Sequence, residues 1–145
     1  MTVRPAEARD CEAVIDLARH AWPETPFPKD QKPDRAFMRG AFQAFIERSD
    51  NLGLVLANSD DQPCGVLALT SFQHMFSGQR LASMLMWWIV PGARGNGLAM
   101  LTAAENWARH KGIDELHLPA HTESLARLCV LSHYVKFETT YRKVL

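Results

Sequence analysis

The segment Trp87–Met100, with the sequence WWIVPGARGNGLAM, passes from an apolar run through a glycine-containing turn into a helical pattern. A helix that starts directly after such a turn leaves its first four N–H groups without helical partners at its positive end. Gly95 and Gly97 keep side chains away from this backbone, and Arg94 adds a full positive charge. The sequence therefore predicts a turn that binds an anion, with phosphate as the leading choice.

Three kinds of phosphate-binding turn can be compared with this segment. A P-loop needs Gly-Lys-Ser/Thr, but the residues from Gly97 on are Gly-Leu-Ala. A dinucleotide fingerprint needs a third glycine where Met100 stands, and Glu123 is the acidic residue nearest the position for the ribose. The pattern Arg-x-x-Gly-x-Gly/Ala fits at every fixed position of Arg94–Ala99. The structural alternative is a tight strand–helix connection with a surface arginine.

The elements around the turn have clear periodicities. Alternating apolar runs at 52–57, 64–72 and 80–90, separated by short turns, predict an antiparallel meander. A helix over 97–111 follows, with Gly112 as its C-cap; it is expected to bury Leu98, Leu101, Ala104, Trp107 and Ala108. A strand within 113–120 then lies parallel to the last meander strand through a right-handed crossover.

The two ends of the chain complete the predicted α+β order β-α-α-β-β-β-α-β-α-β. A short strand at 2–4 precedes a helix capped by Asp10, and Asp34 caps a second helix after the proline-rich loop 23–33. The second helix has a wide apolar stripe that is expected to lie in the core. A last helix runs from Thr122 or Ser124 to about 132, and the alternating segment 135–145 predicts a closing strand. We expect one domain spanning 1–145.

The Arg94–Ala99 motif, the preceding Val90-Pro91 and this element order together resemble the GNAT (N-acetyltransferase) superfamily, in particular small bacterial or phage-type members. The resemblance implies a mostly antiparallel mixed sheet flanked by helices, and acetyl-CoA as co-substrate with no metal. It places the pyrophosphate on the turn and the pantetheine on the backbone of the preceding strand, between two splayed strands. The implied coenzyme-binding residues are Ile89, Val90, Arg94, Gly95, Asn96, Gly97, Leu98 and Ala99.

The implied reaction is direct attack of an amine on the acetyl thioester, which needs a base, an oxyanion donor and an acid for the leaving sulfur. The resemblance places the oxyanion donor, a backbone N–H, within 86–88. Aligning Tyr134 with the aromatic of the family's Gly-Phe or Gly-Tyr pair puts His133 at the glycine and Cys129 where the family's acid tyrosine stands. Cys129 is therefore either a proton donor or a small core residue.

Three side chains are candidates for the general base. His121 follows the fifth strand, and His74 lies in the turn before the fourth. Glu123 is close to His121 and can act through a water. If Cys129 cannot serve as acid, the alternative function is a non-catalytic or weakly catalytic module that binds or senses acyl-CoA. A third alternative is an α/β interaction domain that binds no nucleotide.

Composition limits the partners and the compartment. Sixteen basic and sixteen acidic residues cancel, which argues against nucleic acid or a membrane surface as partner. The three cysteines lack paired spacings, the N-terminus has no signal-peptide pattern, and 84–90 is too short to span a bilayer, so we expect a cytoplasmic protein. Segments 23–33 and 74–80, expected to wall the acceptor site, carry no acidic cluster; a small-molecule or peptide amine is the expected acceptor, and a homodimer is left open.

Overall fold

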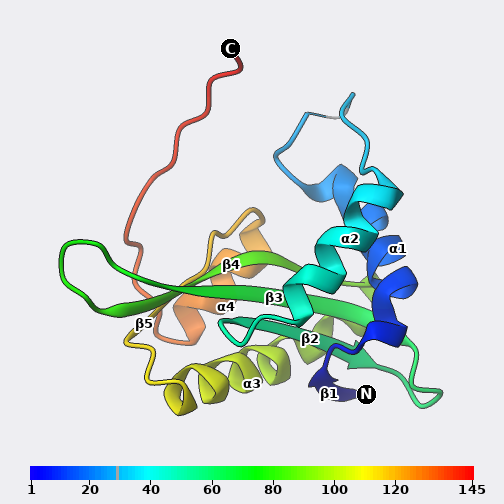
Figure 1. Cartoon of the computed structure of the whole chain (residues 1–145), viewed down its shortest axis with the longest axis horizontal. Coiled ribbons are helices and arrows are strands. Elements are labelled where there is room, and N and C mark those ends of the chain that lie inside the picture. Colours follow the sequence, from blue (N-terminus) through cyan, green and yellow to red (C-terminus); the bar gives the residue numbers. More distant parts are fainter. Residues whose placement is uncertain (29) are drawn as a thin grey trace.

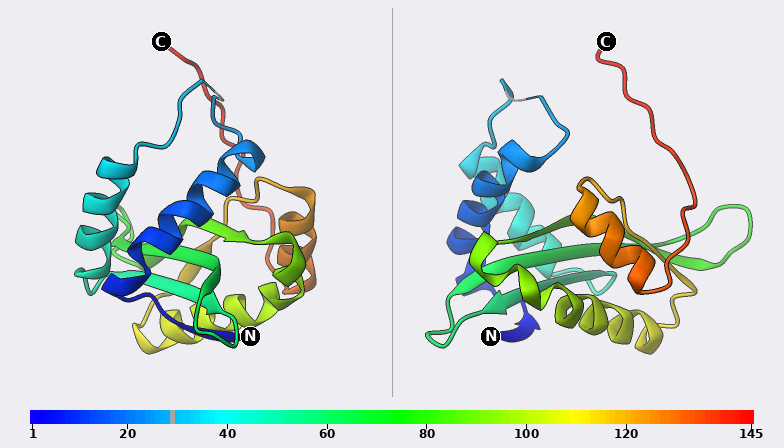
Figure 2. Two further views of the ribbon diagram at one scale, coloured as in Figure 1. Left: turned by 90° about the vertical axis from the view of Figure 1, so that its right-hand side faces the viewer. Right: turned by 180° about the vertical axis from the view of Figure 1, so that it is seen from behind.

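The computed structural model describes residues 1–28 and 30–145, and it contains a five-stranded sheet with helices on both faces (Figures 1 and 2). The strands are β1 (Thr2–Pro5), β2 (Asn51–Ala57), β3 (Pro63–Gln73), β4 (Arg80–Ile89) and β5 (Glu115–His117). The helices are α1 (Cys11–Ala21), α2 (Arg35–Ile46), α3 (Gly97–His110) and α4 (Glu123–Leu131), with 3-10 turns η1 (Ala8–Asp10), η2 (Trp22–Glu24) and η3 (Pro91–Asn96). Among the described residues, no helix has the length and apolar character that crossing a lipid bilayer requires.

The strands lie in the sheet in their sequence order, β1-β2-β3-β4-β5. The pairs β1–β2, β2–β3 and β3–β4 are antiparallel, whereas β5 runs parallel to β4. Since α3 intervenes between β4 and β5, the chain has the length that a parallel crossover requires. The predicted meander, crossover and mixed α+β class are confirmed.

Strand alternation divides the core between the two faces of the sheet. Leu52, Leu54 and Leu56 of β2 pack in one cluster with Met100 and Ala104 of α3. The intervening Val55 packs in a second cluster with Val14 and Leu17 of α1. Because successive side chains of a strand point to opposite faces, each face receives its own apolar layer. Figure 2 shows α1 and α2 on one side of the sheet and α3 and α4 on the other.

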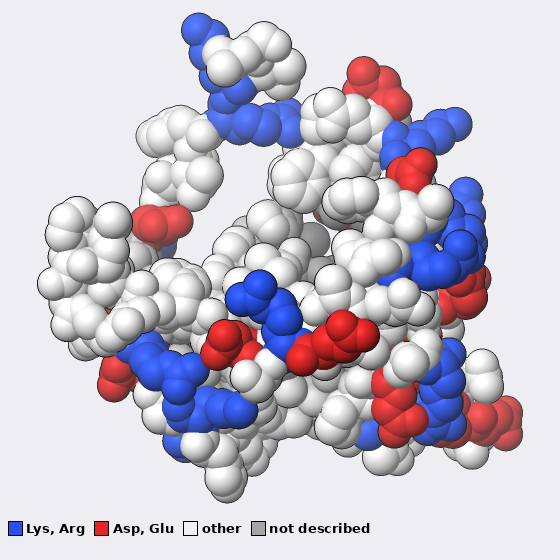
Figure 3. All heavy atoms as spheres, in the orientation of Figure 1, with Lys and Arg blue, Asp and Glu red and all other residues white. Residues whose placement is uncertain are grey.

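The expectation that the apolar stripe of α2 lies in the core holds only in part. No residue of α2 is fully buried, and Phe37 is 76% exposed. Polar contacts also hold the helix: Arg39 Nε lies 2.7 Å from a Glu12 carboxylate oxygen, and Arg35 pairs with Glu12 and Asp16. Figure 3 shows basic and acidic side chains side by side on the side of the molecule where α1 and α2 lie in Figure 1. The helix is therefore attached to α1 by ion pairs, while its apolar face is half-buried, with Phe42 packed against the cluster that contains Val55.

Two further expectations need correction. Leu98 of α3 is 58% exposed, whereas Met100 is fully buried, because the helix turns the latter toward the sheet. Residues 135–145 form no strand; they extend away from the sheet as a tail (Figure 1) with Val135, Phe137 and Tyr141 at least three-quarters exposed. With only three residues, β5 offers few free backbone groups for a further strand to pair with.

An ion pair at the start of the chain links β1 to the turn before α1. The Nη1 and Nη2 of Arg4 donate to the Asp10 carboxylate, at 2.8 and 2.9 Å, while its Nε donates to Asp61 at 2.8 Å. The Glu7 N–H donates to the Asp10 carboxylate at 2.8 Å. The Asp10 side chain is 3% exposed. Burial raises the pKa of Asp10, but the hydrogen bonds from Arg4 and from the Glu7 N–H lower it by more, so the pKa lies below its usual range.

Candidate functional site

The turn after β4 is a compact 3-10 helix that runs directly into α3. The Gly97 N–H donates to the Arg94 carbonyl, and the Asn96 Nδ2 donates to the Ala93 carbonyl at 2.9 Å. A Cβ built on Gly95 would meet no atom within 4 Å, so this glycine borders open space. A Cβ on Gly97 would lie 3.3 Å from Leu128 Cδ2, so this glycine lets α4 pack closely against the start of α3.

Arg94 is held by the protein's own acceptors. Its Nη2 donates to both carboxylate oxygens of Glu24, at 2.7 and 2.8 Å, and its Nε donates to the Ile89 carbonyl at 3.2 Å. The guanidinium is nevertheless about half exposed, at 46%. Sequence reasoning missed Glu24, because η2 and the turn after β4 are seventy residues apart and no local pattern relates them.

The edge of β4 that faces β5 is open over most of its length. The Val90 N–H donates to the Cys64 carbonyl at 2.9 Å. Backbone groups of successive strand residues point to opposite sides, so those of Ile89 point away from β3. On that side β5 pairs only with Leu81–Ser83. From Met84 to Ile89 the two strands are not paired, which leaves a β4 edge that can accept an extended ligand.

An irregularity in β4 lies within this open stretch. Ala68 pairs with Met86 and Leu69 with Met84, so Leu85 is an extra residue, and its side chain is 59% exposed. A bulge of this kind leaves backbone groups unpaired and turns the strand locally. The bulge directly precedes 86–88, the stretch expected to supply the oxyanion donor.

The two tryptophans of β4 point to opposite faces of the sheet, as alternation predicts. Trp87 packs with the cluster under α3, and Trp88 packs with the cluster under α1. The Trp88 Nε1 is buried, and within residues 1–28 and 30–145 it has no hydrogen-bond partner.

The candidate bases lie at different places around the sheet. His74 is in the β3–β4 hairpin, where its Nδ1 accepts from the Ser77 N–H at 3.2 Å; this hairpin lies at the end of β4 opposite the Arg94 turn (Figure 1). His121 is exposed in the segment between β5 and α4, four residues after the last residue of β5 that pairs with β4. Glu123 begins α4 and pairs with Arg127 at 3.0 Å. The structure therefore separates His74 from the turn.

The residues near the predicted acid position are both protonated at neutral pH. Cys129 is 9% exposed, and burial raises the pKa of its thiol. Burial also raises the pKa of Tyr134, and the nearby Glu105 adds to the increase; the Tyr134 hydroxyl donates to the Glu105 carboxylate at 3.0 Å. This bond between the end of α4 and α3, which sequence reasoning did not foresee, gives Tyr134 a structural role.

His133 adopts a conformation that favours glycine, with φ of 66°. The Tyr134 N–H donates to the Cys129 carbonyl at 2.9 Å, which closes the end of α4 and requires this left-handed residue. The family's glycine position, to which His133 was aligned, thus coincides with a positive φ in the structure.

Replacing this residue should stabilise the protein. We expect His133→Gly to raise the free energy of unfolding by about 1 kcal/mol, because a Cβ in the left-handed region costs about that much. Urea unfolding measures the change. Ser132→Gly is the matched control: Ser132 has a φ of −93°, so glycine there should give no gain. Equal effects of the two substitutions would contradict this explanation.

Comparisons with known proteins agree with this geometry. The profile described as Acetyltransferase (GNAT) family matches residues 13–128. An aminoglycoside N(6')-acetyltransferase type 1 of Klebsiella aerogenes is 29% identical over 118 residues, which are 78% of this chain and 74% of that protein. The fold is similar to that of a Trypanosoma brucei acetyltransferase, with a TM-score of 0.78, 16% identity and 99% of both chains covered. It is also similar to the aminoglycoside antibiotic 6'-N-acetyltransferase of Acinetobacter baumannii, with a TM-score of 0.67, 17% identity and 99% and 95% of the chains covered.

Proposed function

Since this chain belongs to the GNAT family of acetyltransferases, we propose that it transfers the acetyl group of acetyl-CoA to the nitrogen of a small-molecule amine. The observation that best supports the proposal is the half-exposed Arg94 guanidinium at the end of an open β4 edge. A cation beside unpaired strand backbone suits a ligand with an anionic diphosphate and an amide-containing arm. The relative from Klebsiella supports a small-molecule acceptor, and we assign the reaction to the cytoplasm because Cys11, Cys64 and Cys129 are free thiols.

The reaction we propose requires no covalent enzyme intermediate. The amine nitrogen forms a bond to the acetyl carbonyl carbon, the carbon–sulfur bond breaks, and the sulfur takes up a proton as the amine loses one. Arg94 and the turn Gly95–Ala99 would bind the diphosphate, and the backbone of Ile89, which points away from β3, would bind the pantetheine amides. Val90, also expected to bind them, has its N–H bonded to the Cys64 carbonyl and its carbonyl bonded to the Ala93 N–H, so we leave it out of this role. An N–H within 86–88 would stabilise the oxyanion. We propose His121 rather than His74 as base, because His121 follows β5, the strand next to β4, whereas His74 lies in the hairpin at the end of β4 opposite the Arg94 turn.

Two measurements test this function. Acetyl-CoA at millimolar concentration should raise the melting temperature, because a ligand that binds only the folded protein stabilises it. Thiol release in the presence of amines should then show turnover. No thermal shift would contradict the proposal. Stabilisation without turnover over the amine panel would favour the second function, an acyl-CoA-binding module; its specific support is Cys129, which stands in the acid position with its thiol buried.

The contact between Glu24 and Arg94 predicts that a change at Glu24 alters the affinity for acetyl-CoA. Glu24 competes with the diphosphate for Arg94, so Glu24→Gln should tighten acetyl-CoA binding, by about two- to fivefold if the exposed pair is worth up to about 1 kcal/mol. Calorimetric titration measures the dissociation constant. In an Arg94→Ala background the Glu24→Gln change should have no effect. An equal gain in both backgrounds would mean that Glu24 acts through overall charge and not through Arg94.

A further inference from the structure

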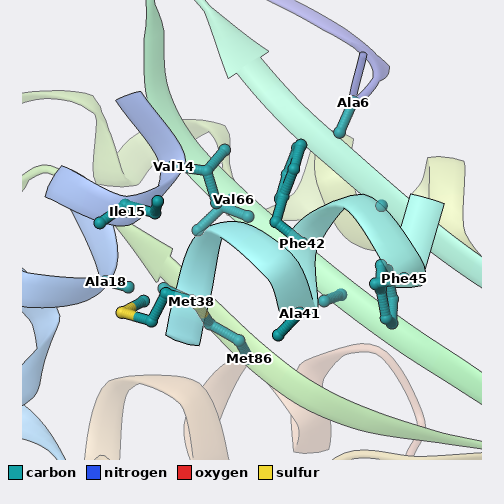
Figure 4. Close-up of a pocket in the computed structure, with 12 residues that line it drawn as sticks. Ala6, Val14, Ile15, Ala18, Met38, Ala41, Phe42, Phe45, Val66 and Met86 are labelled. Atoms are coloured by element: carbon teal, nitrogen blue, oxygen red, sulfur yellow. The ribbon is translucent and has the colours of Figure 1, made fainter. Parts of the chain in front are cut away.

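A carbon-lined cavity of about 200 Å³ lies between α1, α2 and the sheet (Figure 4). Among the residues that the structure describes, those in its walls have no charged or hydrogen-bonding side chain. The walls are formed by Ala6, Val14, Ile15, Ala18, Met38, Ala41, Phe42, Phe45, Gly53, Val66, Ala68 and Met86. The space is partly open to solvent, with Ala41 exposed at its border, and an enclosed apolar cavity of about 150 Å³ is large enough to bind benzene. A space of this size and lining therefore suits an apolar group the size of a phenyl ring that enters from the surface.

Contacts outside the cavity hold α2 at its distance from the sheet. On the α1 side, Arg35 and Arg39 bind the Glu12 carboxylate. At the start of the helix, Asp34 accepts the Phe37 N–H at 2.6 Å, and at its end the Asn51 Nδ2 donates to the Phe45 carbonyl at 2.9 Å. These polar contacts hold both ends of α2, and its apolar face is only half-buried, which leaves the cavity between the helix and the sheet.

The floor of the cavity adjoins the place where acetyl transfer is proposed. Ala68 and Met86 are cross-strand partners beside the bulge at Leu85. Leu85 itself is 59% exposed, so an apolar side chain also stands at the bulge. An acceptor whose apolar group fills the cavity would therefore hold its amine near the β4 residues that we propose for the oxyanion.

The two acidic side chains of α1 that face α2, and Glu24 after α1, have cationic partners. Glu12 and Asp16 of α1 pair with Arg35 and Arg39, and Glu24 pairs with Arg94. A polycation would find no free carboxylate on these pairs, and burying its charges against a carbon lining is costly. On this basis the surroundings favour an acceptor with one amine and an apolar body.

We infer that the acceptor is an amine that carries an aryl or branched alkyl group, and that this group binds in the cavity beneath α2. The inference rests on the proposed acetyltransferase function and narrows its substrate class. It differs from what the names of the Klebsiella and Acinetobacter relatives say of those proteins, which act on aminoglycosides.

The test compares amines and cavity-filling variants. With acetyl-CoA present, 2-phenylethylamine should be acetylated with a higher kcat/KM than an aminoglycoside. Ala68→Leu fills the cavity from the sheet and Ala41→Leu fills it from α2; each should lower kcat/KM for 2-phenylethylamine about tenfold or more, in the range that misfit by a few methylenes produces. Ala36→Leu is the matched control, since Ala36 is exposed on the same helix and does not line the cavity.

The coenzyme serves as an internal check on folding. All three variants should bind acetyl-CoA within about twofold of the unchanged protein, because the cavity is separate from the Arg94 turn. Preference for the aminoglycoside, no turnover of any apolar amine, or insensitivity of 2-phenylethylamine turnover to both fillings would overturn the inference. Failure of the unchanged protein to bind acetyl-CoA would overturn the proposed function instead.

Discussion

Arg94→Ala should weaken acetyl-CoA binding by about 10- to 100-fold, because a charged hydrogen bond contributes about 1.5–3 kcal/mol. The guanidinium stands at the end of the open β4 edge, where we propose that the diphosphate binds. Its present partners, Glu24 and the Ile89 carbonyl, would release it when the ligand binds. Calorimetric titration with acetyl-CoA measures the loss, and the salt dependence of binding should become weaker in the variant.

Arg109→Ala is the matched control for this substitution. Arg109 lies near the other end of α3 and also pairs with a glutamate, Glu105, at 3.1 Å. Both arginines are exposed, so each pair contributes little to folding and both variants should keep nearly the same melting temperature. Equal loss of coenzyme affinity in the two variants would show that total charge, and not the position of Arg94, governs binding.

Arg4→Leu should lower the free energy of unfolding by about 3–5 kcal/mol, the cost of leaving a buried charge unpaired. The Asp10 carboxylate would keep the Glu7 N–H as a partner but lose both bonds from Arg4. Urea unfolding at pH 7 measures the effect. The double substitution Arg4→Leu with Asp10→Asn should recover a large part of the loss, since no buried charge remains.

The loss of stability in Arg4→Leu should depend on pH, and the lowered pKa of Asp10 gives the direction of this dependence. The pKa of Asp10 is lowered in the folded protein, so its stabilisation is fully present above the unfolded value of about 4 and is lost as the pH falls through the folded value. The stability difference between the unchanged protein and Arg4→Leu should therefore shrink below about pH 4. A difference that stays constant from pH 7 to pH 3 would show that Arg4 acts through packing alone.

The sequence correctly predicted the helices and strands around the Arg94 turn, because the residues that cap a helix or alternate along a strand are close together in the sequence. Asp34 accepts the Phe37 N–H as an N-cap should, and Gly112 has the positive φ of 64° expected of a C-cap glycine. The alternation of Trp87 and Trp88 likewise needs no tertiary information. These features let the sequence place the Arg94 turn between a strand and a helix.

The sequence-based predictions that the structure does not bear out concern features that depend on residues far apart in the chain. Periodicity gave α2 an apolar face, but the structure only half-buries that face, and the ion pairs from Arg35 and Arg39 to α1 were not visible in any local pattern. The alternating pattern of 135–145 describes a segment that can pair, yet pairing also needs an available strand edge, and β5 is too short. The Glu24–Arg94 contact joins segments seventy residues apart, so it can be identified only from the folded structure.

The most direct test of the account is to follow the backbone amides by ¹⁵N–¹H NMR during titration with acetyl-CoA. If the diphosphate binds where β4 leads into α3, the largest shifts should fall on the amides of Gly95, Gly97, Leu98 and Ala99, with smaller shifts along β4 toward Leu85. The Arg94→Ala variant should need a higher ligand concentration for the same shifts. Saturable binding that leaves the amides of this turn unmoved would contradict the account.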